Sequence, residues 1–366
     1  MKTLTLLTTA LPLFLFAACG GDDPKKTDAP AAQDSPAAKQ QSQADSQPAK
    51  RKPRKRMRRP KVNYQAIKVL FGAEPPAPKA EVASTPELVA LGKALYHSEH
   101  LSAKGNLSCA SCHDLSNYGV DNKPTSTGST GEKGERNTPT TYNAARQFKQ
   151  FWDGRADTVE AQAIMPVLNP IEHGLADEAE LVAKIKEQTD LVEGFKKAFP
   201  GDADPVTAKN FGVAIGAFER TLVTRSKWDD YLDGNQKALS NEELAGLKVF
   251  FDVGCQACHM GRTLGGTMFQ KYGLHKPYTG KDTGRHKLDG DEAQKYFFKV
   301  PALLNVAETA PYLHDGSIAT LEVAVRDMLD KQIAPSIAAK VTDEQVKHLV
   351  AFLNALTGEL PDEFKK

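Results

Sequence analysis

The sequence reads CASCH at residues 109–113 and CQACH at residues 255–259. Each motif has two cysteines separated by two residues and followed directly by a histidine, the attachment pattern of c-type haem. Thiols one helical turn apart can reach the two vinyl groups of the porphyrin, and the adjacent histidine is then delivered to the iron. Cysteines at this spacing can also hold zinc or form a thioredoxin-like redox pair, but two accidental matches to the full motif are negligible. We therefore predict two covalent c-type haems, held by Cys109, Cys112 and His113 and by Cys255, Cys258 and His259.

The segments that precede the two motifs resemble each other. TPEL at residues 85–88 leads to LGKALY at 91–96, and SNEEL at 240–244 leads to GLKVFF at 246–251. Each half thus presents a capped helix with an aromatic end ahead of its cysteine motif, and strand-like alternation is scarce. We expect a mainly α fold of two c-type cytochrome-like haem domains packed across an interdomain interface.

Two further stretches carry helix signals. Thr342 and Gln345 form a capping box ahead of an apolar run at helical spacing, and Gly358 stands where that helix would stop. Asp177 opens an amphipathic run that we expect to extend to Leu191.

The N-terminus is predicted to be an export signal. Lys2 is followed by an apolar run over residues 4–16 and by AACG at 17–20, the layout of a secretory signal peptide that is too short to span a bilayer comfortably. A cysteine after small residues is typical of a bacterial lipoprotein signal over residues 1–19, with Cys19 lipidated, although Phe16 stands where leucine is usual. The alternative is an ordinary cleaved signal that discards Cys19. We expect a membrane-anchored lipoprotein on the periplasmic side, without disulfides because the other cysteines attach haem.

Residues 20–61 are predicted to be a disordered basic tether, because they have almost no large apolar side chains to offset the entropy of ordering. The basic run at 50–59 would contact anionic lipid head groups, or it is simply a solvated spacer. We assign residues 62–230 to the first haem domain and 231–366 to the second, with a C-terminal helix that can pack back on the first domain. The folded part is mildly acidic, and we expect no nucleic-acid partner.

Several more motifs follow in a fixed order and carry a resemblance that covers nearly everything from Leu70 to Leu356. They are PTSTG at 124–128, RNTPT at 136–140, FWDGR at 151–155, Gln162, Pro166, NPIE at 169–172 and TAPYLHDG at 309–316. In order and spacing the chain resembles the bacterial di-haem cytochrome c peroxidases. The resemblance implies an enzyme that reduces hydrogen peroxide to water with electrons from a small cytochrome c or cupredoxin, and that tends to form homodimers.

The resemblance also distinguishes the two haems. Met328 is implied as the far ligand of the second haem, where a thioether raises the reduction potential and suits the haem that receives electrons; the alternative is a methionine that merely packs in the core. For the first haem, many relatives carry a histidine directly after TSTG, whereas this chain has Ser129. If no other group substitutes, the first haem should be open in the oxidised enzyme. His173, where relatives usually have methionine, is interpreted as a surface or packing histidine, and is the first candidate ligand should that haem prove closed.

Peroxide cleavage requires a proton to move from the near oxygen to the leaving oxygen, so a carboxylate above an open haem can act as acid and base. Glu172 matches the family residue with that role; the alternative is a surface glutamate or a helix cap. Gln162 and Phe151 would shape the same pocket. Trp152 matches a tryptophan between the haems that would help electrons cross, although buried tryptophans also simply pack.

The family also holds a calcium ion between its domains, which here implies the Asn137 side chain and the carbonyls of Thr309 and Pro311 as ligands. One departure is Leu304, where relatives often have arginine, so that a positive charge is missing near the haems.

Two other functions remain open. A protein-modifying enzyme resembling MauG would draw electrons from the aromatic side chains of a partner protein. Such an enzyme has tyrosine in place of the methionine ligand, so Met328 argues against it, whereas the absent distal histidine argues for it. A plain di-haem electron carrier would need both irons six-coordinate and Glu172 idle.

Overall fold

The computed structural model describes residues 57–75, 78–80 and 82–365, all within one compact unit. The predicted signal, Cys19 and most of the predicted tether lie outside the described residues. At the end of that tether, the Arg59 guanidinium donates a hydrogen bond to the carbonyl of Leu239 (3.3 Å). No helix in the described part of the chain has both the length and the apolar character needed to cross a bilayer.

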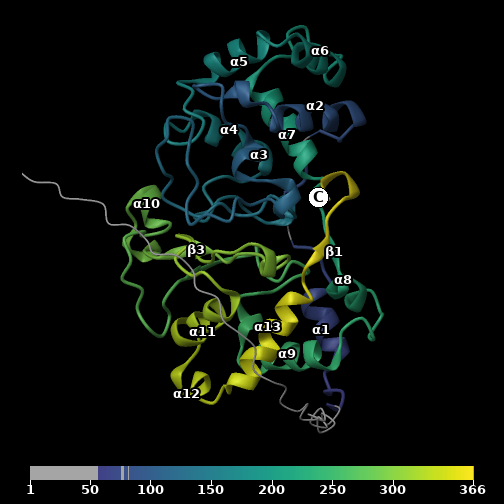
Figure 1. Ribbon diagram of the computed structural model, residues 1–366, viewed down its shortest axis with the longest axis vertical. Helices are drawn as coiled ribbons and strands as arrows, with labels where there is room; N and C mark the ends of the chain where they lie inside the picture. The colour runs from purple at the N-terminus through teal and green to yellow at the C-terminus, as the bar shows by residue number, and fades with distance from the viewer. Residues whose placement is uncertain (1–56, 76–77, 81, 366) are drawn as a thin grey trace, which may run out of the picture. The chain divides into compact units, whose positions relative to one another are not determined.

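The described chain is mainly helical, as predicted, with short strands that pair antiparallel, β1 with β4 and β2 with β3 (Figure 1). The elements are α1 (Tyr64–Phe71), α2 (Pro86–Tyr96), α3 (Cys109–Cys112), α4 (Val159–Leu168), α5 (Glu178–Lys186), α6 (Thr189–Ala198), α7 (Ala208–Glu219), β1 (Arg225–Ser226), α8 (Lys227–Leu232), α9 (Asn241–Asp252), β2 (Phe269–Lys271), α10 (His286–Asp289), β3 (Phe297–Lys299), α11 (Leu321–Gln332), α12 (Pro335–Ala338), α13 (Asp343–Asn354) and β4 (Gly358–Glu359).

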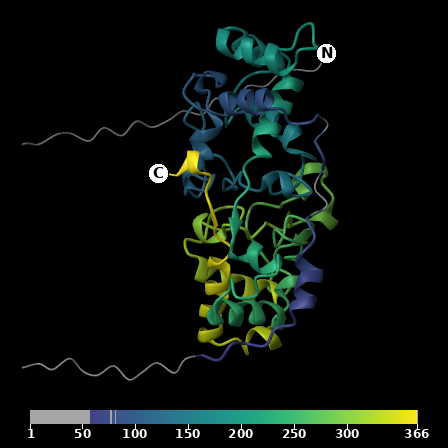
Figure 2. The same cartoon turned by 90° about the vertical axis from the view of Figure 1, so that its right-hand side faces the viewer.

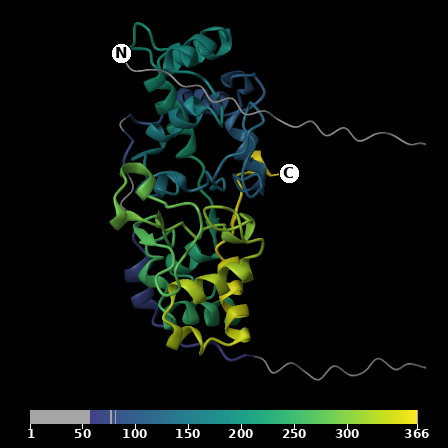
Figure 3. The ribbon, with the colours of Figure 1, turned by 90° about the vertical axis from the view of Figure 1, so that its left-hand side faces the viewer.

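The buried apolar side chains form two separate cores. The first core is built from α2, α4, α5, α6 and α7, and the second from α1, α8, α9, α11 and α13; Figures 2 and 3 show the same two groups of helices from opposite sides. The helix α1 joins the second core through Ile67 and Phe71, although the sequence assigned its residues to the first domain. Phe364, near the C-terminus, is buried in the first core.

Side-chain caps start the helices that the sequence singled out. Thr85 accepts a hydrogen bond from the Leu88 amide at the start of α2 (3.2 Å), and the boxes at Ser240 and Thr342 open α9 and α13. Each satisfies amides that the first helical turn leaves without partners. The run after Asp177 is broken into α5 and α6 at residues 187–188, where the sequence predicted continuous amphipathic character.

The two halves share one close helix crossing. In the first half α2 packs against α7, and a Cβ on Gly92 would lie 1.9 Å from the Ala214 carbonyl oxygen. In the second half α9 packs against α13, and a Cβ on Gly246 would lie 1.9 Å from the His348 carbonyl oxygen. Both positions admit only hydrogen in place of a side chain, so the internal repeat extends from sequence to packing.

Gly358 does not end α13, as the sequence suggested, but starts β4. A Cβ there would lie 2.7 Å from that of Thr224, so the glycine permits β4 to approach β1. The helix itself ends four residues earlier, at Asn354.

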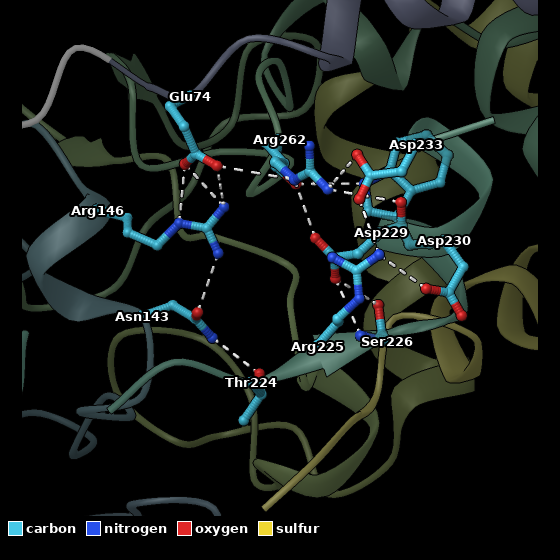
Figure 4. Close-up of polar contacts among 11 residues, drawn as sticks. Glu74, Asn143, Arg146, Thr224, Arg225, Ser226, Asp229, Asp230, Asp233 and Arg262 are labelled. Atoms are coloured by element: carbon cyan, nitrogen blue, oxygen red, sulfur yellow. Dashed lines mark hydrogen bonds and ion pairs between the residues drawn. The ribbon is translucent and has the colours of Figure 1, made fainter. Parts of the chain in front are cut away.

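A polar network surrounds the start of α8 (Figure 4). Asp229 is buried, accepts from the Ser226 amide (3.0 Å) and pairs with Arg262 (3.0 Å). Arg262 lies 3.7 Å from Glu74, whose carboxylate also pairs with Arg146 at 2.8 Å. Through Glu74, the linker between α1 and α2 therefore contacts Arg262 near the second core and Arg146 near the first core.

Arg262→Met should lower the free energy of unfolding by about 3 kcal/mol, because it leaves the buried Asp229 carboxylate without its cation. Denaturant unfolding of the haem-loaded protein, followed by circular dichroism, measures the loss. Lys248→Met is the matched control, since it breaks only the exposed pair with Asp252 and should cost less than about 0.5 kcal/mol. Equal losses in the two variants would contradict the argument.

Candidate active site

The first cysteine motif forms a single helical turn. Ser108 and Ser111 make a capping box around α3, which fixes the turn that carries the thiols of Cys109 and Cys112. Burial raises the pKa of Cys109 to about 12, and it does the same for Cys255 in the second motif. Both are therefore neutral thiols in these surroundings, and a neutral thioether to a porphyrin vinyl group suits such burial.

The two motif histidines are oriented in the same way. Nδ1 of His113 lies 3.3 Å from the Gly119 carbonyl oxygen, and Nδ1 of His259 lies 3.1 Å from that of Leu264. Burial lowers the pKa of both imidazoles, so each is neutral and donates its Nδ1 proton to the carbonyl. The lone pair at Nε2 is then available to an iron, which is the arrangement that fixes haem and metal ligands elsewhere. The residues present fit two c-type haems.

A cavity of about 350 Å³ adjoins the first motif. It brings together most of the residues that the sequence assigned to the first haem. Its walls include Cys109, Cys112, His113, Asn137, Phe151, Trp152, Gln162, Glu172 and His173. Residues from five separate stretches of chain thus converge on one space.

Glu172 is a carboxyl group within this cavity. Burial raises its pKa, while a hydrogen bond from the Asn169 amide to Oε1 (2.7 Å) and the charge of Arg155 act in the opposite direction. The net upward shift brings protonation closer to neutral pH, which suits a group that both accepts and returns a proton.

Ser129 faces away from the cavity. Its hydroxyl donates to Asn106 Oδ1 (2.7 Å) and accepts from the Lys104 amide (3.1 Å), and its own amide donates to the Glu172 carbonyl (2.8 Å). Gly128 allows this contact, because a Cβ there would lie 1.6 Å from the Ile171 carbonyl oxygen. The loop that carries a histidine in many relatives is thus packed onto the turn that carries Glu172.

His173 is a buried residue of the cavity wall and not a surface histidine. Its Nδ1 lies 2.8 Å from the Leu101 carbonyl oxygen, and burial lowers its pKa. It is therefore a neutral imidazole anchored through the backbone in the same manner as His113.

Trp152 is held at the boundary between the two halves. Its indole Nε1 donates to the Asn137 carbonyl (2.9 Å), and its own carbonyl accepts from the amide of Lys299 in β3 (2.7 Å). Its neighbour Phe151 has a φ of 65°, a left-handed conformation that is uncommon for a bulky residue, and packs beneath the Arg155 guanidinium at 3.5 Å. Such backbone strain is found where surrounding structure fixes a functional side chain.

Two buried charged residues of the cavity wall, Lys299 and Glu219, were missed from the sequence. Lys299 is buried, which lowers its pKa to about 7, and its Nζ donates to the Lys149 carbonyl (3.0 Å). Glu219 ends α7 and is also buried. The only signal for Lys299 was a lysine within the otherwise apolar stretch FFKVP at 297–301; Glu219 gave none. Leu304, in the position often held by arginine, is buried in the second core.

The second motif and its predicted far ligand lie in the other half. Cys255 packs against the second core, and Met328 is half-buried on α11 between Val325 and Leu329 of that core. The neighbouring Asp327 accepts a hydrogen bond from the Tyr272 hydroxyl. This links α11 to the segment that follows β2.

The residues implied in calcium binding lie on two segments that are far apart in the chain. A backbone hydrogen bond connects these two segments. The Asn137 amide donates to the carbonyl of His314 (2.8 Å), three residues after Pro311, and the Asn137 side chain donates to the Lys123 carbonyl (2.9 Å). Thr309 and Pro311 flank Ala310, whose carbonyl accepts from Asn122 (2.8 Å). Within the described residues, no three or more His, Cys, Asp or Glu side chains gather as a metal site.

Comparison with known proteins finds di-haem cytochrome c peroxidases and MauG proteins among the relatives of this chain. A family model described as di-haem cytochrome c peroxidase matches residues 86–237. The chain is 41% identical over 304 residues to a cytochrome c551 peroxidase of Nitrosomonas europaea, covering 82% of this chain and 89% of that protein. It is 35% identical over 295 residues to the methylamine utilization protein MauG of Methylorubrum extorquens, covering 78% and 82%. A solved MauG-like protein associated with microbial copper homeostasis has a TM-score of 0.72 at 29% identity, covering 80% of this chain and 96% of that one.

Proposed function

The chain belongs to the di-haem cytochrome c peroxidase family, and on that premise we propose that it reduces hydrogen peroxide to water with electrons from a small cytochrome c or cupredoxin. The observation that carries the proposal is the convergence of His113, Glu172 and Trp152 on one cavity beside a cysteine motif. When bound, the two haems supply the irons that bind peroxide and carry electrons. The remaining chemistry falls to the residues of the chain.

Glu172 is proposed as the acid and base. Its carboxylate takes the proton from the near oxygen of peroxide and returns it to the leaving oxygen, which departs as water. The Asn169 bond to Oε1 orients the carboxyl group. Gln162 and Phe151 line the same space and are proposed to position peroxide beside it.

Trp152 is proposed as the residue past which electrons cross between the two halves. It lines the first cavity, and its backbone is bonded to β3 in the opposite half. A rigid indole in that place offers a polarisable path and also packs the boundary.

Met328 is proposed as the far ligand of the second haem. Met328→Ala should abolish the charge-transfer absorption band that a methionine sulfur gives to haem iron. It should also lower the reduction potential of that haem by on the order of 0.1–0.3 V, since axial ligands tune potentials over a range of about 0.8 V. Met165→Ala, which alters an exposed methionine, is the control, and retention of the band in Met328→Ala would exclude this ligand.

A calcium ion held by Asn137, Thr309 and Pro311 is likewise proposed, supported by the oxygen character of these groups. Dialysis against a chelator, followed by metal analysis and an activity assay, tests it. We further propose a periplasmic lipoprotein anchored through Cys19, which labelling with a fatty-acid analogue tests against a Cys19→Ser variant, and a homodimer, which sedimentation of the haem-loaded protein tests.

The function itself is tested by steady-state turnover of peroxide with a reduced small cytochrome c as donor. Rapid oxidation of the donor, at two electrons for each peroxide consumed, supports the peroxidase. The MauG relatives and Ser129 favour a protein-modifying oxidase as the second candidate. Slow donor turnover together with peroxide-dependent oxidation of a partner's aromatic side chains would favour that alternative.

A further inference from the structure

Glu219 is a carboxylate with no described partner at the wall of the first cavity. Only 6% of the residue is exposed, and it shares the cavity with His113 and Glu172. Across the part of the chain that the structure describes, no hydrogen-bond donor and no cation contacts its side chain: the guanidinium of Arg220, the next residue, is engaged by Glu160 at 2.9 and 3.1 Å. A buried carboxylate in this situation is costly as an anion.

The groups around Glu219 do not offset that cost. Glu160 on α4 repels its charge, and Arg220, the residue that follows α7, offsets this only in part. The other titratable groups that interact with it are Tyr96 on α2 and Cys109 on α3. Burial raises the pKa of both, so they are neutral. Burial and the charge of Glu160 together raise the pKa of Glu219 to about 8.

We propose that Glu219 is the redox-linked proton site of the first haem, binding one proton when that haem gains an electron and releasing it on reoxidation. In the coupled step, one electron enters the haem iron from the reductant, one proton enters from solvent, and an O–H bond forms on the Glu219 carboxylate. The inference rests on the presence of a haem in this cavity and not on peroxide turnover.

The physical reason is the charge balance of a space with low dielectric constant. Reduction removes one positive charge from the iron, so the affinity of a nearby carboxylate for a proton rises. Burial and the charge of Glu160 raise the pKa of Glu219 to about 8, which brings the exchange of this proton close to working pH. Reduction of peroxide consumes two protons along with two electrons. A carboxylate that takes up a proton when the haem takes up an electron therefore brings one proton to the cavity before peroxide is reduced.

The test is a redox titration of the haem-loaded protein at a series of pH values, with each haem followed by its absorption. In the wild type, the potential of the first haem should fall as the pH rises through neutrality, by up to about 59 mV for each pH unit, the value for one electron and one proton. In Glu219→Gln that slope should vanish, and above the pKa of Glu219 the variant's potential should be the higher one, because the amide carries no negative charge. The second haem serves as the internal reference, since its slope should be the same in both proteins.

Two further variants separate the effect of Glu219 from that of Glu172, which lines the same cavity. Glu219→Asp should retain the slope, displaced along the pH axis, whereas Glu172→Gln should leave the wild-type slope in place. A slope that survives in Glu219→Gln, or one that disappears only in Glu172→Gln, would overturn the proposal. If Glu219→Gln fails to take up haem, infrared difference spectra of the wild type decide: a protonated carboxyl band should appear as the first haem is reduced, and its absence would overturn the proposal equally.

Discussion

Glu172→Gln should lower the rate at which the enzyme reacts with peroxide by about 10²- to 10⁴-fold, the usual contribution of a positioned acid and base. Glutamine preserves the shape of the side chain and the bond from Asn169, but its amide cannot take the proton from the near oxygen of peroxide. Stopped-flow absorption at limiting peroxide measures the rate directly, without dependence on the donor.

The pH dependence of the same rate gives a second measure. The carboxylate must be ionised to accept a proton, so the rate should fall as the pH is lowered through the pKa of Glu172. Because burial raises that pKa, the fall should occur at a higher pH than for an ordinary glutamate and should be absent from Glu172→Gln. Glu178→Gln, an exposed position at the start of α5, is the control. Full activity in Glu172→Gln would favour the plain electron carrier or another acid.

The fully oxidised enzyme should react with peroxide immediately on mixing, with no prior reduction. Ser129 occupies the position of the closing histidine in many relatives, and its hydroxyl is bonded to Asn106 and Lys104 away from the cavity. Ser129→His should suppress the reaction of the oxidised protein by on the order of 100-fold, provided that the closed form is favoured by about 3 kcal/mol. Prior reduction should then restore the reaction.

Ser129→Ala is the matched control for this second prediction, because it removes the hydrogen bonds of the hydroxyl without supplying an iron ligand. It should react in the oxidised state as the wild type does. An oxidised-state spectrum with two six-coordinate low-spin haems, both with protein ligands, would contradict the prediction. In that event His173, buried in the same cavity, is the residue to replace by methionine.

What the sequence predicted well was local. The caps at Thr85, Ser240 and Thr342 and the paired helices before each cysteine motif are all encoded within a few residues, so short-range spacing is enough to find them. The residues predicted for the first site also line one cavity. They could be predicted because the family resemblance assigned them by their order in the chain.

What the sequence did not predict depends on contacts between distant segments. The helix α1 belongs to the second core because Phe71 packs against Trp228 with ring centroids 5.3 Å apart, a contact that no local pattern announces. Lys299 and Glu219 are buried in the cavity wall for the same kind of reason. In the sequence, an isolated lysine or glutamate at the edge of an apolar stretch looks the same whether its side chain faces solvent or a haem.

The matched glycines at the two helix crossings bear on how mutations would be tolerated. Because α2 and α9 each contact the opposing helix through a glycine backbone, substitutions at residues 92 and 246 should be tolerated less well than substitutions at neighbouring surface residues. The two crossings sit in different cores, so each half has its own position at which an added side chain would force two packed helices apart.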